Sequence, residues 1–189
     1  MKTLFYRLVL KFGGWTVVNH NHETVEQAVI IGAPHTSNWD FVYALPGLNE
    51  LQITGYRYLI KKEFFFWPFS WLFNSTGGIP VDRSKKNDLT ENLKAMLASG
   101  ELKYLLFPPE GTRSRVERWK TGFYYTAIDT GLPIILGYMN YKDRQMGLGK
   151  AFYPTGDLKK DLAEIEKFYE NIPGKNPKNY NPQIFLREE

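Results

Sequence analysis

The sequence predicts an α/β fold: a single domain with a mostly parallel central sheet flanked by helices, preceded by an amphipathic N-terminal helix. Short apolar segments typical of buried strands alternate with segments whose apolar residues recur at helical spacing. The chain of 189 residues has the length of one ordinary domain. It contains no cysteine, which excludes disulfides and thiolate chemistry.

Residues 1–18 are expected to form a basic amphipathic helix. Apolar residues recur there at helical spacing, at Leu4, Phe5, Leu8, Val9 and Phe12. Basic residues lie between them, and no acidic residue occurs in this segment. The sequence leaves two roles open for such a helix: packing on the core and docking on a membrane surface.

Residues 19–175 are expected to form the α/β domain, and residues 176–189, rich in Asn and Pro, a surface tail. Apolar segments predict strands at 28–32, 56–60, 79–81, 102–107 and 134–138. Helical spacing predicts helices at 38–45, 88–97, 116–129 and 158–169. Glycine or proline marks several ends, such as Pro46-Gly47 after the first of these helices.

The net charge is +4, from Lys+Arg 24 against Asp+Glu 20, and it permits an anionic partner without selecting one. No apolar run approaches the roughly 18 to 20 residues that span a bilayer, and no signal peptide is recognisable. We therefore expect a cytoplasmic protein whose membrane contact, if it has one, is peripheral.

The most informative motif is His35 followed by Asp40, at the junction of the strand 28–32 and the next helix. A neutral imidazole can take a proton from a hydroxyl, and a carboxylate on its other ring nitrogen fixes the tautomer. The structural alternative is a capping box, because Ser37 and Asp40 have its spacing. Both interpretations are open at this point.

A second motif, Glu110-Gly111-Thr112-Arg113, follows the strand 102–107. A guanidinium group matches phosphate oxygens, and glycine lets backbone N–H groups approach an anion. The alternative is a tight turn closed by a surface ion pair. Lys61 and Arg83 stand at the ends of two other strands, so the cations are expected to meet at one edge of the sheet.

Seven aromatic residues crowd into the ten positions 64–73, namely Phe64, Phe65, Phe66, Trp67, Phe69, Trp71 and Phe73. An exposed aromatic run is unfavourable in water but favourable at a lipid interface or around an acyl chain. A buried core helix is the alternative. We expect the membrane or acyl-chain use, because one buried helix face needs fewer aromatic residues.

In their order along the chain, these motifs resemble the glycerophospholipid acyltransferases, the family that includes 1-acylglycerol-3-phosphate acyltransferase. The resembling blocks are His35 to Asp40, Lys61 to Glu63, Gly78 to Arg83, Pro109 to Ser114 and Leu132 to Gly137. The resemblance implies that His35 deprotonates an acceptor hydroxyl and that Asp40 orients His35. The alkoxide would attack the thioester of acyl-CoA or acyl carrier protein without a covalent acyl-enzyme.

The resemblance also implies that Arg113, with Lys61 and Arg83, holds the acceptor phosphate. Glu110 would order that loop, Gly111 would leave room for substrate, and Thr112 belongs to the same substrate-binding block. An oxyanion on the thioester carbonyl needs a donor, for which we expect a backbone N–H near Gly111 or on the Pro34 loop.

The expected function is an O-acyltransferase of membrane lipid synthesis at the cytoplasmic membrane face, with 1-acylglycerol-3-phosphate as the acceptor. The alternatives are a different lysolipid or a hydroxylated aminolipid as acceptor, a thioesterase or lipid hydrolase, and a non-catalytic module that binds anionic lipids. We expect no cofactor, no metal and no nucleic-acid partner. The pair His20 and His22 lacks a third metal ligand.

Overall fold

The computed structural model describes residues 2–19, 25–81 and 86–184, with side chains except at 2 and 86–90. A seven-stranded sheet in the order β1-β7-β6-β2-β5-β3-β4 forms its centre. The strands are β1 (Thr16–Asn19), β2 (Ala28–Ala33), β3 (Tyr56–Lys61), β4 (Gly78–Val81), β5 (Tyr104–Phe107), β6 (Ile134–Asn140) and β7 (Gln145–Phe152). All neighbouring strands are parallel except β6 and β7, which confirms the predicted fold class.

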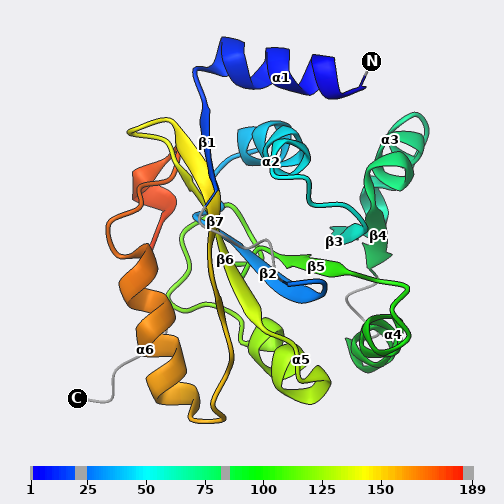
Figure 1. Ribbon diagram of the computed structural model, residues 1–189, viewed down its shortest axis with the longest axis vertical. Helices are drawn as coiled ribbons and strands as arrows, with labels where there is room; N and C mark the ends of the chain where they lie inside the picture. Colours follow the sequence, from blue (N-terminus) through cyan, green and yellow to red (C-terminus); the bar gives the residue numbers. More distant parts are fainter. Residues whose placement is uncertain (1, 20–24, 82–85, 185–189) are drawn as a thin grey trace.

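Helices cover both faces of this sheet (Figure 1). They are α1 (Lys2–Gly13), α2 (Trp39–Glu50), α3 (Phe69–Thr76), α4 (Lys86–Ala98), α5 (Gly122–Thr130) and α6 (Leu158–Tyr169), with short 3-10 helices η1 (Lys62–Phe64) and η2 (Pro177–Asn179). Strand β2 is buried on both sides: Val29 and Ile31 face α5 and α6, whereas Ala28 and Ile30 face α2. A continuous apolar run is what such a central parallel strand requires.

Helix α2 lies between two other helices on its face of the sheet. Arg7 of α1 forms an ion pair with Glu50 of α2 at 3.0 Å. On the other side, the Phe73 ring of α3 packs edge-on against the Phe41 ring of α2, with centroids 6.2 Å apart. Helix α2 is therefore flanked by α1 and α3.

The N-terminal helix is shorter than predicted. It ends at Gly13, and Gly14 adopts a φ of +68°, a conformation that favours glycine. The chain then turns, and residues 16–19 form edge strand β1 beside β7 instead of continuing the helix to residue 18. Strand β7, rich in glycine, was not predicted.

The prediction that Pro46-Gly47 ends the first helix after residue 45 was wrong, because α2 continues to Glu50. Both residues are buried within it. A Cβ at Gly47 would lie 2.4 Å from the Met146 sulfur, so the glycine allows α2 to approach β7 closely. The packing of the helix on the sheet outweighs its local breakers.

Two further predictions were wrong. Helix α5 begins at Gly122 rather than at 116, and the loop before it buries Trp119, whose backbone N–H donates to the Ile184 carbonyl at 3.1 Å. The segment 176–184, predicted as surface tail, contributes two side chains to the core. Tyr180 and Ile184 are buried with residues of α5 and α6.

Candidate active site

His35, in the loop between β2 and α2, pairs with Asp40, the second residue of α2. The distance from His35 Nδ1 to Asp40 Oδ2 is 3.2 Å. The imidazole is partly exposed, whereas the carboxylate is nearly buried. With Nδ1–H donated to Asp40, the ring is in the tautomer whose Nε2 can accept a proton from a substrate.

The loop that precedes α2 also holds the Asp40 carboxylate. Its Oδ2 accepts the backbone N–H of Thr36 at 2.8 Å and that of Ser37 at 2.9 Å. The predicted capping box does not form as such, because Asn38 is the N-cap of α2 and makes no side-chain capping bond. The bond from Ser37 nevertheless lets Asp40 close the preceding loop as well as orient His35.

A second carboxylate holds the backbone of the same histidine. The N–H of His35 donates to Glu110 Oε1 at 2.8 Å. This contact follows from the sheet: β2 and β5 are adjacent and parallel, with Ile31 opposite Phe107, so their next loops leave the same edge side by side. Glu110 thus contacts the loop of His35; its predicted role in ordering the Arg113 loop stays a prediction.

Glu110 is a buried acid. It is 4% exposed, and no group among the described residues donates to its Oε2. Burial raises the pKa of Glu110 from 4.5 to about 7, although the His35 N–H opposes the shift. Because this carboxylate points inward to His35, it does not close a surface ion pair with the neighbouring arginine.

The turn after Glu110 presents Arg113 to solvent. Gly111 adopts a φ of +65°, and its N–H donates to the Pro108 carbonyl at 3.0 Å. A Cβ at Gly111 would lie 2.8 Å from Lys120 Nζ, so glycine fits both the turn and its neighbour. Thr112 and Arg113 are exposed, and Arg113 forms no ion pair within the part of the chain that the structure describes. Its guanidinium group is open to an anion.

The other predicted cations are not shown next to His35. Lys61 is exposed at the end of β3, which is separated from β2 by β5, roughly 10 Å at ordinary strand spacing. It shares the sheet edge with His35 but does not touch it. Arg83, His20 and His22 lie outside the described residues.

Two groups at the site were not predicted. The Tyr141 hydroxyl donates to Asp40 Oδ1 at 2.7 Å. Asn176 donates its backbone N–H to Thr36 Oγ1 at 3.1 Å and its side-chain amide to the Thr36 carbonyl at 2.8 Å. Neither residue belongs to a recognisable motif. The segments that carry them are distant in sequence from His35, and the tertiary fold brings them to the site.

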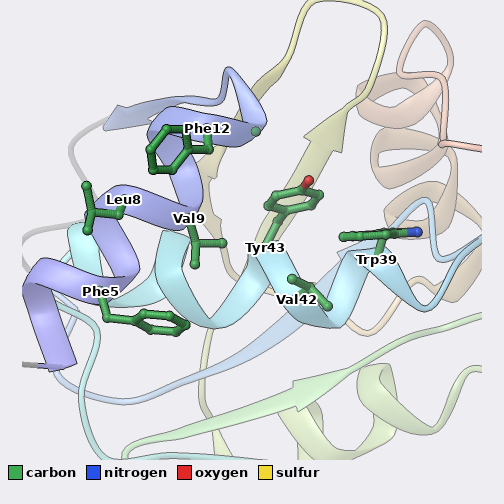
Figure 2. Close-up of a pocket in the computed structure, with 8 residues that line it drawn as sticks. Phe5, Leu8, Val9, Phe12, Trp39, Val42 and Tyr43 are labelled. Carbon is green, nitrogen blue, oxygen red and sulfur yellow. The ribbon is translucent and has the colours of Figure 1, made fainter.

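An apolar groove of about 480 Å³ runs between α1 and α2. Figure 2 shows the side chains on its two walls: Phe5, Leu8, Val9 and Phe12 from α1, and Trp39, Val42 and Tyr43 from α2. Trp39 is the first residue of α2, next to the loop of His35. One wall of the groove therefore includes the residue that directly precedes Asp40 in the chain.

The aromatic segment 64–73 does not form a buried core helix. Within α3 only Thr76 is buried, and the exposed aromatic residues of the segment are Phe64, Phe66, Trp67, Phe69 and Trp71. Phe65 and Phe73 are partly buried and pack on each other, with centroids 5.6 Å apart. Among the described residues, no helix is sufficiently long and apolar to cross a bilayer.

Comparison with known proteins identifies the family. The family model described as Acyltransferase matches residues 16–136, more than half of the chain. The matched range contains His35, Asp40, Glu110 and Arg113, whereas Tyr141 lies beyond it. No match was found among curated proteins.

We expect Glu110→Gln to change how stability depends on pH. An acid whose pKa is about 7 when folded and about 4.5 when unfolded makes the folded state less stable as pH rises through this window. The neutral amide removes that loss while still accepting the His35 N–H. Relative to wild type, the variant should gain up to about 3 kcal/mol in free energy of unfolding between about pH 5 and about pH 8.

Urea unfolding at both pH values measures this difference. Glu101→Gln, at an exposed carboxylate, is the matched control and should run parallel to wild type. A Glu110→Gln curve that also runs parallel to wild type would contradict the assignment of a protonated, buried Glu110.

Proposed function

The chain belongs to the Acyltransferase family, and on that premise we propose that it transfers a fatty acyl group from acyl-CoA or acyl carrier protein to the free hydroxyl of a lysolipid. The proposed acceptor is 1-acylglycerol-3-phosphate. The observation that carries the proposal is the His35–Asp40 pair, in which Asp40 holds the imidazole through Nδ1 at the start of a helix that lines an apolar groove. A non-catalytic lipid binder has no need of such a base beside a carboxylate.

The proposed reaction needs no covalent enzyme intermediate. His35 Nε2 takes the proton of the acceptor hydroxyl, and the oxygen attacks the thioester carbonyl carbon. As the C–S bond breaks, the leaving thiolate takes that proton from the imidazolium and departs as thiol. Asp40 stabilises the imidazolium between these steps.

Four of the backbone N–H groups in the two loops first expected to stabilise the oxyanion of this reaction already have partners. The backbone N–H groups of Gly111, His35, Thr36 and Ser37 already donate within the protein. In this conformation none of the four is available to a carbonyl oxygen. Arg113, exposed on the neighbouring turn, is assigned to the acceptor phosphate, with Lys61 and Arg83 as further cations.

We further propose that the protein works as a peripheral protein at the cytoplasmic face of a membrane. The exposed apolar residues of α1 and of the segment 64–73 support this, since both helices pack against α2. Basic residues Arg7 and Lys11 lie among the exposed apolar residues of α1, as in helices that lie on anionic lipid. A membrane there would also supply the lysolipid.

Supplied with acyl-CoA or acylated acyl carrier protein, purified protein should convert lysophosphatidate in vesicles to the diacylated lipid. It should release one thiol from the donor per product molecule. His35→Ala should lower turnover by roughly 10² to 10⁴-fold, because it removes the general base. Thiol release is followed spectrophotometrically and the lipid product by mass spectrometry. Asp40→Asn is the second variant and should lower turnover much more than it changes acceptor affinity.

Three results would contradict this assignment in different ways. Thiol release without an acceptor would indicate a thioesterase. Acylation of a different lysolipid or aminolipid would change the acceptor and keep the reaction. A third outcome is no turnover across a panel of lysolipids together with vesicle binding that His35→Ala does not affect. That outcome would favour a non-catalytic module that binds anionic lipids.

Arg113→Ala should raise the apparent KM for lysophosphatidate by roughly tenfold to a hundredfold with little change in kcat, because charge-assisted hydrogen bonds to phosphate are lost. Steady-state kinetics with monoacylglycerol, which has no phosphate, should show no such change. Arg118→Ala is the matched control, since Arg118 is an exposed arginine of the same loop. An equal effect on the phosphate-free acceptor would remove Arg113 from the phosphate site.

Replacing the most exposed aromatic residues should weaken vesicle binding. Phe12 and Trp71 are 85% and 73% exposed, and each contributes apolar area to a lipid surface. Phe12→Ser and Trp71→Ser should each reduce partitioning to anionic vesicles by roughly tenfold, measured by flotation. Tyr153→Ser, at an exposed aromatic after β7, is the control and should bind like wild type. Unchanged flotation of both test variants would argue against this membrane face.

A further inference from the structure

Tyr141 contacts the Asp40 carboxylate from outside the matched family region. It lies in the turn between β6 and β7, and its hydroxyl donates to Asp40 Oδ1 at 2.7 Å. The backbone N–H groups of the loop and the His35 ring all approach the other oxygen, Oδ2. Among the described residues, Tyr141 is the donor recorded at Oδ1.

The Tyr141 side chain is itself held in place. Its ring meets the Trp15 ring edge-on, with centroids 4.8 Å apart and an interplanar angle of 86°. Its backbone N–H donates to the Pro173 carbonyl at 3.2 Å. Trp15 is buried and lies two residues after the end of α1, so the turn that follows α1 packs against the residue that holds Asp40.

The phenol remains a hydrogen-bond donor at neutral pH. Burial raises the pKa of Tyr141 well above its ordinary value, and the hydrogen bond to Asp40 raises it further. A permanent donor on one carboxylate oxygen limits rotation of the carboxylate about the Cβ–Cγ bond. That rotation decides whether Oδ2 faces the imidazole.

We propose that Tyr141 is a positioning residue of the acyl-transfer site, whose hydroxyl fixes the Asp40 carboxylate so that Oδ2 receives the Nδ1–H of His35. The proposal rests on the proposed function for its kinetic consequence. Its structural content, that Tyr141 sets the tautomer of His35 through Asp40, does not depend on which acceptor the protein uses.

The kinetic test is Tyr141→Phe, which keeps the ring against Trp15 and removes only the hydroxyl. We expect kcat to fall by about tenfold, the usual effect of losing a hydrogen bond to a charged group, with KM for donor and acceptor within about twofold. Tyr104→Phe is the matched control, because its partly buried phenol donates to the Val25 carbonyl at 2.7 Å, a contact outside the site. It should keep the wild-type kcat, and thermal unfolding of both variants shows whether their losses of stability are comparable.

A double-mutant cycle tests whether the effect passes through Asp40. In an Asp40→Asn background, Tyr141→Phe should change kcat by less than about twofold, because the carboxylate it positions is gone. An equal fall in kcat in both backgrounds would overturn the proposal. So would a wild-type kcat in Tyr141→Phe, or a Tyr104→Phe variant that loses as much activity.

A spectroscopic arm separates this proposal from the proposed function. Long-range ¹H–¹⁵N correlations report the tautomer of His35, assigned by its disappearance in His35→Ala. Wild type should show the Nδ1–H tautomer, and Tyr141→Phe should shift the ring nitrogens toward a mixture of tautomers. If wild type acylates no lysolipid but Tyr141→Phe changes the His35 ¹⁵N shifts, the proposed function is wrong and the positioning role stands. If Tyr141→Phe leaves these shifts unchanged, the positioning role is wrong, whatever activity the protein has.

Discussion

The site depends on one buried charge, the Asp40 carboxylate. Removing a carboxylate from water is unfavourable unless hydrogen bonds replace the water. Asp40 obtains them from two backbone N–H groups of the loop before α2, from the His35 ring and from the Tyr141 hydroxyl. These bonds stabilise the charge and fix the loop, so the orientation of His35 is a consequence of solvating Asp40 within the protein.

Two carboxylates in different environments hold the same histidine. Asp40 accepts from its ring, and Glu110, from the neighbouring strand end, accepts from its backbone. Asp40 is surrounded by donors, whereas Glu110 is buried with one oxygen unpaired among the described residues, which is why its pKa is raised to about 7. The side-by-side exit of β2 and β5 from a parallel sheet brings the two motifs together.

The sequence predicted those parts of the site that depend on local spacing or on the rule that the carboxyl ends of parallel strands lie at one edge of a sheet. His35 and Asp40 are close in the chain, and Glu110 follows a strand whose end had to lie at the same edge. Tyr141 and Asn176 could not be predicted, because the former precedes a strand too rich in glycine to show strand periodicity and the latter lies in an Asn/Pro-rich end. Likewise, nothing local shows that α2 passes through Pro46, since that depends on packing against the sheet.

Helix α2 joins the chemistry to the exposed apolar surface. It begins beside the His35 loop, shares a groove with α1 and packs its Phe41 ring against α3. Exposed aromatic side chains on α1 and α3 are unfavourable in water, and a lipid surface removes that cost. A membrane meeting both helices would lie against the face on which α2 is central. The residues that hold His35 are therefore close to where a membrane lipid would be presented. Trp15, which follows α1, contacts Tyr141, and Tyr141 in turn donates to Asp40, so a chain of contacts joins α1 to the site.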